Sequence, residues 1–345
     1  AFIFIDIIYQ AQQWLECYYD RRIIDDENRI MKLGIIMDPI EGINIEKDSS
    51  FAMLLEAQSR GWEIYYMEMD DLFLVNDIPS ATTRRMTVED EVSRWYQFHD
   101  AMTLSLFDLD VILMRKDPPF NMEYIYSTYL LELAHRQGTL VVNDPASLRD
   151  ANEKLFVSWF PQCTTPTLVA RKSEHILAFL DEHRDIILKP LDGMGGASIF
   201  RIQNPDQNTN VIIETLTENG AKHVMVQKFI PEIVHGDKRI LIINGDPVPY
   251  ALARIPKEGE IRGNLAAGGT AKGVELTDRD RWICEQLAPV LKDKGLLFVG
   301  IDVIGDYLTE INVTSPTCIR ELDTIYNLDI AGDLMDAIEQ KLATA

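Results

Sequence analysis

Positively charged residues are scarce in this chain relative to negatively charged ones. The 345 residues include 33 Lys and Arg against 55 Asp and Glu, which gives a formal net charge of -22. Proteins that bind nucleic acids or anionic membranes need a basic surface that displaces counterions from phosphates. The charge therefore excludes a general nucleic-acid or anionic-membrane binder. Any phosphate-bearing ligand must be held by a local basic cluster or by a metal ion.

Cysteines are few, and long apolar runs are missing. Cys17, Cys163, Cys284 and Cys318 are scattered, with no C-x-x-C pair and no histidine at metal-ligand spacing. No apolar stretch approaches the ~20 residues that a helix needs to cross a bilayer. We therefore expect free thiols in a reducing compartment, a cytoplasmic location and no membrane partner.

The first thirty residues differ in pattern from the rest of the chain. They lack the basic start and the small-residue cleavage site of a signal peptide. We expect residues 1–30 to be translated upstream sequence outside the fold; an amphipathic N-terminal helix is the alternative. A variant that starts at Met31 is expected to keep full activity, and loss of folding or turnover would contradict this expectation.

Residues 31–150 alternate short apolar runs with amphipathic stretches. Strands are expected at MKLGIIMD, WEIYYME, LDVILMR and TLVVN, with helices at SSFAMLLEAQSRG and NMEYIYSTYLLELAHRQG. Asp48 and its two following serines are candidate helix N-caps, and Gly61 and Gly138 are expected to close helices. This alternation is typical of a parallel α/β sheet. Residues 76–101 are polar and weakly periodic, and we expect them to form a long excursion from this domain.

From about residue 151 the strand signals follow one another more closely. A helix over DPASLRDANEKLFVSWF is expected to lead into strands at TPTLVAR, DIILKP, ASIFRIQ, HVMVQKFI, KRILIING and PVPYALAR. This mixture predicts an α+β architecture with antiparallel sheets. Residues 255–273 are rich in glycine and charge and predict a mobile loop, read either as a lid over a phosphate site or as a plain surface loop.

A glycine-rich segment, KPLDGMGGAS, begins at Lys189. It matches neither the P-loop nor the dinucleotide fingerprint, because a strand rather than a helix follows it. We expect a hairpin loop whose backbone N–H groups can reach phosphate oxygens. Lys189, at the end of the preceding strand, and Lys154, on the helix entering the domain, would supply two ammonium groups beside that loop.

Three oxygen-bearing side chains alternate with apolar ones in a C-terminal hairpin. A three-residue turn over 305–307 would place Asp302 opposite Glu310, with Asn312 on the same polar face. A two-residue turn would pair Asp302 with Thr309 instead, so we predict the three-residue turn. Carboxylate and amide oxygens suit Mg²⁺. A solvent-facing polar strand is the alternative reading.

At these residues the chain resembles the ATP-grasp ligases, and specifically the bacterial glutathione synthetases. The resemblance extends from Met31 to near the C-terminus and rests on long strings that include SLRDANEKL, DIILKPLDGMGGASIF, GDKRILIINGDPVPYALARIP and LTEINVTSPTCIRE. It implies an N-terminal α/β substrate domain over 31–150 and a two-part ATP-grasp domain. The two parts would be a small lid-side subdomain over 151–235 and a C-terminal subdomain over 236–345.

The resemblance also implies roles for individual residues. ATP would be bound by Lys154, Lys189, Gly193, Gly195, Gly196, Gln227, Lys228, Phe229, Ile230 and Asp237. Mg²⁺, or Mn²⁺ in its place, would be held by Asp302, Glu310 and Asn312. The catalytic residues would be Arg239 and Arg254, and the substrate would be met by Arg115, Ser315, Thr317 and Arg320.

The family's reaction is the ligation of γ-glutamylcysteine and glycine through an acyl phosphate, with ATP as co-substrate. The resemblance further implies a homotetramer. The alternatives are another ATP-grasp amino-acid ligase, of the D-alanine-D-alanine or glutamate-adding kind, and a nucleotide sensor without catalytic activity. A sensor would have little need for the metal face at Glu310 and Asn312.

Overall fold

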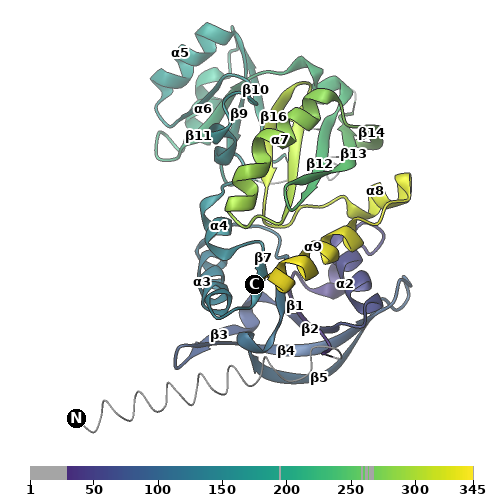
Figure 1. Ribbon diagram of the computed structural model, residues 1–345. Helices are drawn as coiled ribbons and strands as arrows, with labels where there is room; N and C mark the ends of the chain where they lie inside the picture. The colour runs from purple at the N-terminus through teal and green to yellow at the C-terminus, as the bar shows by residue number, and fades with distance from the viewer. Residues whose placement is uncertain (1–28, 194–195, 258, 261–262, 264–267, 345) are drawn as a thin grey trace, which may run out of the picture. The chain divides into compact units, whose positions relative to one another are not determined.

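The computed structural model describes residues 29–193, 196–257, 259–260, 263 and 268–344 (Figure 1). The chain divides into two units, residues 1–31 and residues 32–345. The first thirty residues lie almost wholly outside the described part, so the expectations for them stay predictions. All the helices and strands that the structure describes lie in the second unit.

The first sheet carries a parallel core with an antiparallel extension. Its seven strands follow the order β3-β4-β2-β1-β6-β7, and β5 pairs with β4. The parallel strands are β1 (Lys32–Ile36), β2 (Glu63–Met67), β6 (Val111–Met114) and β7 (Leu140–Val142), and the antiparallel ones are β3 (Leu72–Val75), β4 (Ile78–Val88) and β5 (Tyr96–Ser105). The predicted parallel α/β sheet is confirmed.

The expectation of a long excursion over residues 76–101 is wrong. Most of this stretch forms β4 and β5, which pair along their length. Residues of β5 are exposed or half-buried throughout, so this strand has no buried apolar face. A strand without a buried face does not need alternating apolar residues, and the period-2 signal is therefore lost.

Helices of the first domain begin where the sequence places their caps. They are α2 (Ser49–Ser59), α3 (Met122–Arg136) and α4 (Pro145–Asp150). Asp48 caps α2 by accepting a 2.7 Å hydrogen bond from the Phe51 N–H. Gly61 and Gly138 follow α2 and α3 with positive φ, the conformation that glycine adopts most readily. The predicted caps and stops are confirmed.

The single helix expected over residues 144–160 is divided in two. Helix α4 ends at Asp150, and a separate 3-10 helix runs from Leu155 to Trp159. Asn152 lies in the break, and its side chain accepts hydrogen bonds from the backbone N–H groups of Lys154 and Leu155. This local bonding competes with a continuous helix. Lys154 is therefore on a non-helical segment rather than on a helix.

The remaining strands form two antiparallel sheets, as predicted. One follows the order β10-β9-β11-β8 and the other β14-β13-β12-β15-β16. The four strands of the second sheet are β8 (Thr167–Ala170), β9 (Asp185–Pro190), β10 (Phe200–Gln203) and β11 (Val224–Lys228). The five strands of the third sheet are β12 (Asp237–Ile243), β13 (Asp246–Ile255), β14 (Thr270–Glu275), β15 (Phe298–Ile304) and β16 (Tyr307–Asn312). The other helices are α5 (Ser173–His183), α6 (Thr209–Leu216), α7 (Asp278–Asp293), α8 (Ile319–Tyr326) and α9 (Ile330–Thr344).

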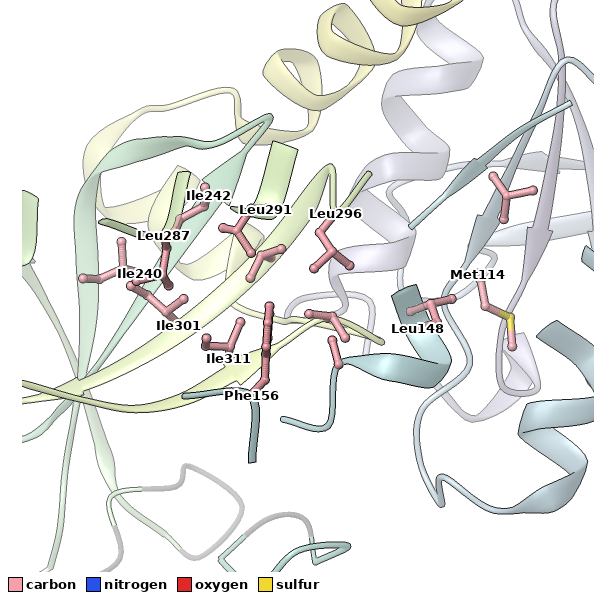
Figure 2. Packing of buried hydrophobic residues seen from close by; sticks show 14 of the residues in the cluster. Met114, Leu148, Phe156, Ile240, Ile242, Leu287, Leu291, Leu296, Ile301 and Ile311 are labelled. Carbon is pink, nitrogen blue, oxygen red and sulfur yellow. The ribbon is translucent and has the colours of Figure 1, made fainter. Parts of the chain in front are cut away.

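Apolar packing holds the third sheet against α7. Ile240, Ile301 and Ile311 on three strands share one cluster with Leu287 and Leu291 of α7 (Figure 2). All five side chains are fully buried. Burial of each such side chain contributes ~1.5–3 kcal/mol, so this layer provides a rigid platform for the polar faces of β15 and β16.

Short 3-10 helices connect several elements. They are η1 (Ile40–Gly42), η2 (Met69–Asp71), η3 (Leu106–Asp108), η4 (Leu155–Trp159) and η5 (Pro231–His235). Of the helices in the described ranges, none combines the length and the apolar character needed to cross a lipid bilayer.

The last helix, α9, packs against α2 of the first domain and also contacts β12 of the third sheet. Helix α9 contacts α2, and Arg60, the C-cap residue that follows α2, pairs with Asp336 at 2.7 Å and donates to the Gly332 carbonyl. Asp323 of α8 accepts a hydrogen bond from the N–H of Ile330, the first residue of α9. Burial, together with Asp329 and Asp333, raises the pKa of Asp323 to about 6.

Asp323 is expected to lower stability as the pH rises. Below about pH 4 the carboxyl group is protonated in both the folded and unfolded states. Between about pH 4 and pH 6 the folded state binds more protons than the unfolded one, so the free energy of unfolding falls, and above pH 6 the full penalty remains. Asp323→Asn removes the penalty and keeps an acceptor for Ile330. It should stabilise the protein by about 1 kcal/mol at pH 7 and by much less at pH 4, after allowance for partial exposure.

Urea unfolding at a series of pH values measures this effect. Asp246→Asn, at a carboxylate whose side chain is 82% exposed, is the matched control and should leave the pH profile unchanged. An Asp323→Asn variant with the same pH profile as the parent would contradict the prediction.

Candidate active site

The largest cluster of predicted site residues lines one cleft between the second and third sheets. Strands β9 and β11 of the second sheet contribute to its walls, as do β12, β13, β15 and β16 of the third. The predicted residues that line it are Lys154, Lys189, Gly193, Gly196, Gln227, Lys228, Phe229, Ile230, Asp237, Arg239, Arg254, Asp302, Glu310, Asn312, Ser315 and Thr317. Residues far apart in the sequence therefore meet at a single site.

Two lysines converge on Glu310 in this cleft. The Nζ atoms of Lys154 and Lys189 lie 3.8 and 3.7 Å from Glu310 Oε1. Lys154 Nζ also contacts the Glu153 carboxylate and the carbonyl of Gly193, in the glycine-rich segment. Lys189 Nζ donates to the Thr309 carbonyl at 3.2 Å. The two ammonium groups and the glycine-rich segment thus lie together, as the sequence predicts for a phosphate site.

Burial affects the two lysines differently. Burial lowers the pKa of Lys189, and the attraction of Glu310 does not fully offset it. Burial also opposes the charged form of Lys154, but Glu310 and Glu153 outweigh it and raise the pKa of Lys154. Additional negative charge from a ligand would favour the charged form of both lysines.

The glycine-rich segment joins two antiparallel strands, as expected. Strand β9 ends at Pro190 and β10 begins at Phe200, with Leu188 opposite Phe200. Gly193 lies against Pro190, where an added Cβ would come within 2.7 Å of Pro190 Cγ. Gly195 lies outside the described residues.

Two buried arginines hold Asp302. Arg239 donates from Nε and Nη2 to the two carboxylate oxygens at 2.6 and 3.1 Å, and Arg254 Nη2 lies 2.9 Å from Oδ2. Burial alone would raise the pKa of Asp302, but both guanidinium groups outweigh it and hold that pKa well below its usual range. The two guanidinium groups therefore favour the ionised form of Asp302.

Asp237 and Arg254 retain unused polar atoms. They contact each other, yet Asp237 Oδ1 and Arg254 Nε are buried and accept or donate no hydrogen bond within the described part of the chain. Burial raises the pKa of Asp237 to about 6 in spite of Arg254. Buried polar groups without partners are costly and are concentrated at binding sites.

The hairpin of β15 and β16 pairs Asp302 with Glu310, as predicted, but through a different turn. Ile304 lies opposite Tyr307, so the turn has two residues, and the prediction of a three-residue turn is wrong. A β-bulge at Thr309 adds one residue to β16 and restores the pairing beyond it. The Thr309 hydroxyl donates to the Asp302 carbonyl at 3.1 Å across the bulge.

The resulting polar face brings three oxygen-bearing side chains together. Asp302, Glu310 and Asn312 all line the cleft. Asn312 donates from Nδ2 to the Gly300 carbonyl at 3.2 Å and approaches Asp302 Oδ2 at 3.4 Å. Within the described ranges, no three His, Cys, Asp or Glu side chains form a metal cluster of their own. The two carboxylates and the amide would therefore supply part of a Mg²⁺ shell, and phosphate oxygens and water would complete it.

Comparisons with known proteins agree with this geometry. Two family models match: the prokaryotic glutathione synthetase N-terminal domain over residues 31–149, and the prokaryotic glutathione synthetase ATP-grasp domain over residues 153–327. The chain belongs to the prokaryotic glutathione synthetase family. It is therefore an ATP-dependent ligase with an ATP-grasp fold, and the predicted family, enzyme class and fold class are confirmed.

Relatives of this glutathione synthetase family match nearly the whole chain. The glutathione synthetase of Vibrio cholerae serotype O1 is 61% identical over 317 residues, which cover 92% of this chain and 100% of the relative. That of Escherichia coli O6:H1 is 60% identical over 313 residues, which cover 91% and 99%.

Solved structures resemble the chain in fold. D-cycloserine synthetase DcsG superposes with a TM-score of 0.63 at 16% identity, over 90% of this chain and 99% of that one. The ATP-grasp ligase PsnB, complexed with minimal precursor, Mg and ADP, superposes with a TM-score of 0.58 at 17% identity, over 90% and 98%. At such low identity these likenesses establish the ATP-grasp fold alone.

Two predicted substrate residues do not line the cleft. Arg115 is buried behind its wall, where Nε donates to Ser50 Oγ at 3.0 Å and Nη2 to the Pro316 carbonyl at 2.8 Å. Burial lowers the pKa of Arg115. Arg320 pairs with Asp90 at 2.8 Å. Arg115 therefore supports the segment that carries Ser315 and Thr317, and the role of both arginines toward substrate stays a prediction.

Sequence reasoning missed two carboxylates that line the cleft, Glu153 and Asp117. Burial raises the pKa of Glu153, although Lys154 opposes the shift. Its position next to Lys154 was the signal that could have revealed it. Asp117 lies two residues after Arg115, which the resemblance implies as a substrate residue, and this proximity was the signal that could have revealed it.

Proposed function

We propose that this protein ligates γ-glutamylcysteine and glycine, with ATP as the source of energy, to give glutathione, ADP and phosphate. The observation that carries the proposal is the convergence of Lys154 and Lys189 on Glu310, on the same hairpin as Asp302 and Asn312. Phosphate-binding cations and metal-binding oxygens then lie in one cleft. Membership in the glutathione synthetase family supports the choice of substrates.

The cationic side chains of the cleft would stabilise the negative charge of the reactants. The cysteinyl carboxylate of the dipeptide attacks the γ-phosphorus of ATP, ADP leaves, and an acyl phosphate forms. Lys154, Lys189, Arg239 and Arg254 would offset the repulsion between the two anions. Mg²⁺, when bound by Asp302, Glu310 and Asn312, would supply further positive charge at the phosphates.

The second step forms the amide bond. The neutral amine of glycine attacks the acyl carbon, the nitrogen loses a proton, and phosphate leaves with the bonding electrons. No protein nucleophile is required for either step. The site's contribution is to position the reactants and to stabilise developing charge.

The same proposal covers the identity of the metal ion, the oligomeric state and the cellular location. We infer that Mg²⁺ is the usual ion and that Mn²⁺ can replace it, because the donor set consists of hard oxygens. We propose a homotetramer on the strength of the family resemblance. A cytoplasmic location is supported by the free thiols of Cys163, Cys284 and Cys318.

One assay tests the proposed function. Phosphate release from ATP should require γ-glutamylcysteine and glycine together, and glutathione should form in equal amount. Release driven by D-alanine or by glutamate addition would indicate another ATP-grasp ligase. ATP that stays intact with both substrates present would indicate a nucleotide sensor.

A further inference from the structure

The cleft is lined by five described carboxylates, and one of them differs from the others. Four contact a cationic side chain of the same cleft: Glu153 with Lys154, Glu310 with Lys189, Asp237 with Arg254, and Asp302 with Arg239. The fifth is Asp117. Among the residues that the structure describes, none reaches the Asp117 carboxylate with a hydrogen bond or with an ion pair within 4.0 Å.

The backbone of Asp117 is nevertheless fixed. Its N–H donates to Asp38 Oδ2 at 3.0 Å, and its carbonyl accepts from Lys116 Nζ at 2.7 Å. Lys116 also pairs with Asp38 at 2.8 Å. Pro118 follows and restricts the backbone of Asp117 to extended conformations. The main chain thus holds the residue in place while its carboxylate stays available to a ligand.

Asp117 also lies apart from the phosphate-binding elements in the chain's topology. It follows β6 of the first sheet, whereas the other cleft carboxylates belong to the third sheet or to the segment beside Lys154. Arg115, which interacts electrostatically with Asp117, is buried and bound to Ser50 and to the Pro316 carbonyl. Arg115 therefore does not neutralise Asp117 by direct contact.

The chemistry of the substrates identifies a ligand for this carboxylate. Nucleotide phosphates would be repelled by it, and Asp117 follows β6, outside the β15–β16 hairpin whose oxygen atoms would hold a metal ion. Both amino-acid substrates carry a primary ammonium group, which pairs with a carboxylate in a charge-assisted hydrogen bond. The other four carboxylates already have cationic partners in the cleft.

We propose that Asp117 binds the primary ammonium group of an amino-acid substrate, either the α-ammonium of the γ-glutamyl residue or the ammonium of glycine. The inference rests on the proposed function and deepens it, because it names a specificity-determining residue for the same cleft. Asp117 recognises substrate and takes no part in transferring the phosphoryl group.

Steady-state kinetics of Asp117→Asn test the proposal. Loss of a charged hydrogen bond should raise the KM of the recognised substrate about 10- to 100-fold. The KM of ATP should change less than about twofold. Glu123→Gln is the matched control, since Glu123 is exposed in the first turn of α3 and does not line the cleft. It should leave all three KM values unchanged.

A substrate analogue separates recognition from a general structural effect. Glutaryl-cysteine is γ-glutamylcysteine without its α-amino group. If Asp117 binds that group, the parent enzyme should discriminate against glutaryl-cysteine, and Asp117→Asn should accept both dipeptides with similar KM values. If the KM of glycine rises instead, the ammonium comes from glycine.

Other outcomes overturn the proposal. Unchanged KM values for both amino-acid substrates would show that Asp117 binds neither. An equal rise in all three KM values, with an altered melting temperature, would show a structural role. A parent protein that forms no glutathione would reject the proposed function itself, which distinguishes that failure from a failure of this inference.

Discussion

Glu310→Gln should reduce glutathione formation at least about 10²-fold while leaving the fold intact, which corresponds to ~3 kcal/mol of transition-state stabilisation. Glu310 Oε1 lies 3.8 Å from Lys154 Nζ and 3.7 Å from Lys189 Nζ, and the side chain shares the polar face with Asp302. Glutamine has nearly the same shape, so packing is retained. The negative charge that would attract Mg²⁺ and orient both lysines is lost.

Initial rates over a series of Mg²⁺ concentrations measure this loss. Weaker metal binding predicts that raising the Mg²⁺ concentration restores part of the rate. Glu275→Gln is the control, because Glu275 is exposed on β14 of the same sheet. Near-normal turnover of Glu310→Gln at ordinary Mg²⁺ would show that this face of the hairpin is merely solvated.

Asp302→Asn should have the largest effect on stability. Asp302 is 3% exposed and pairs with the buried guanidinium groups of Arg239 and Arg254. Among the described residues, asparagine leaves the buried Arg239 guanidinium without a carboxylate partner, and Arg254 keeps only Asp237. Breaking a buried pair of this kind costs ~3–5 kcal/mol, a large part of the ~5–15 kcal/mol that stabilises a typical protein.

Denaturant unfolding of Asp302→Asn measures that cost, and a second variant identifies its cause. In the double variant Asp302→Asn with Arg239→Met, the guanidinium group that Asp302→Asn leaves unpaired is gone, so part of the lost stability should return. Activity should not return, because both residues belong to the proposed site. A double variant that is no more stable than Asp302→Asn alone would show that unpaired charge is not the reason for the loss.

The hairpin of β15 and β16 shows what a sequence pattern can predict about strand pairing and what it cannot. Alternation of apolar and polar residues correctly predicted that Asp302, Glu310 and Asn312 share one face, because the side-chain period of a strand is two. The pattern could not distinguish a longer turn from a bulge, since each adds one residue to the loop between the paired positions. The bulge at Thr309 was therefore missed.

The antiparallel extension of the first sheet shows where sequence patterns fail to predict a strand. Strands β4 and β5 pair over most of their length, yet β5 buries none of its residues. Strand β5 is joined to the sheet by backbone pairing with β4, a neighbour whose identity is not encoded locally. A polar segment of this kind resembles a loop until its partner strand is known.

Within this chain, the sequence by itself determined the family, the parallel strands of the first sheet, the antiparallel character of the sheets that follow, and the residue types that could hold phosphate and metal. These properties depend on local patterns and on long matching strings. Only the tertiary structure decided which charges meet: that Arg239 and Arg254 share Asp302, that Arg115 is buried behind the cleft, and that Asp117 lines the cleft with no cationic partner among the residues that the structure describes. Such contacts involve residues that are far apart in the sequence, and electrostatic interactions depend on distance and burial rather than on separation along the chain.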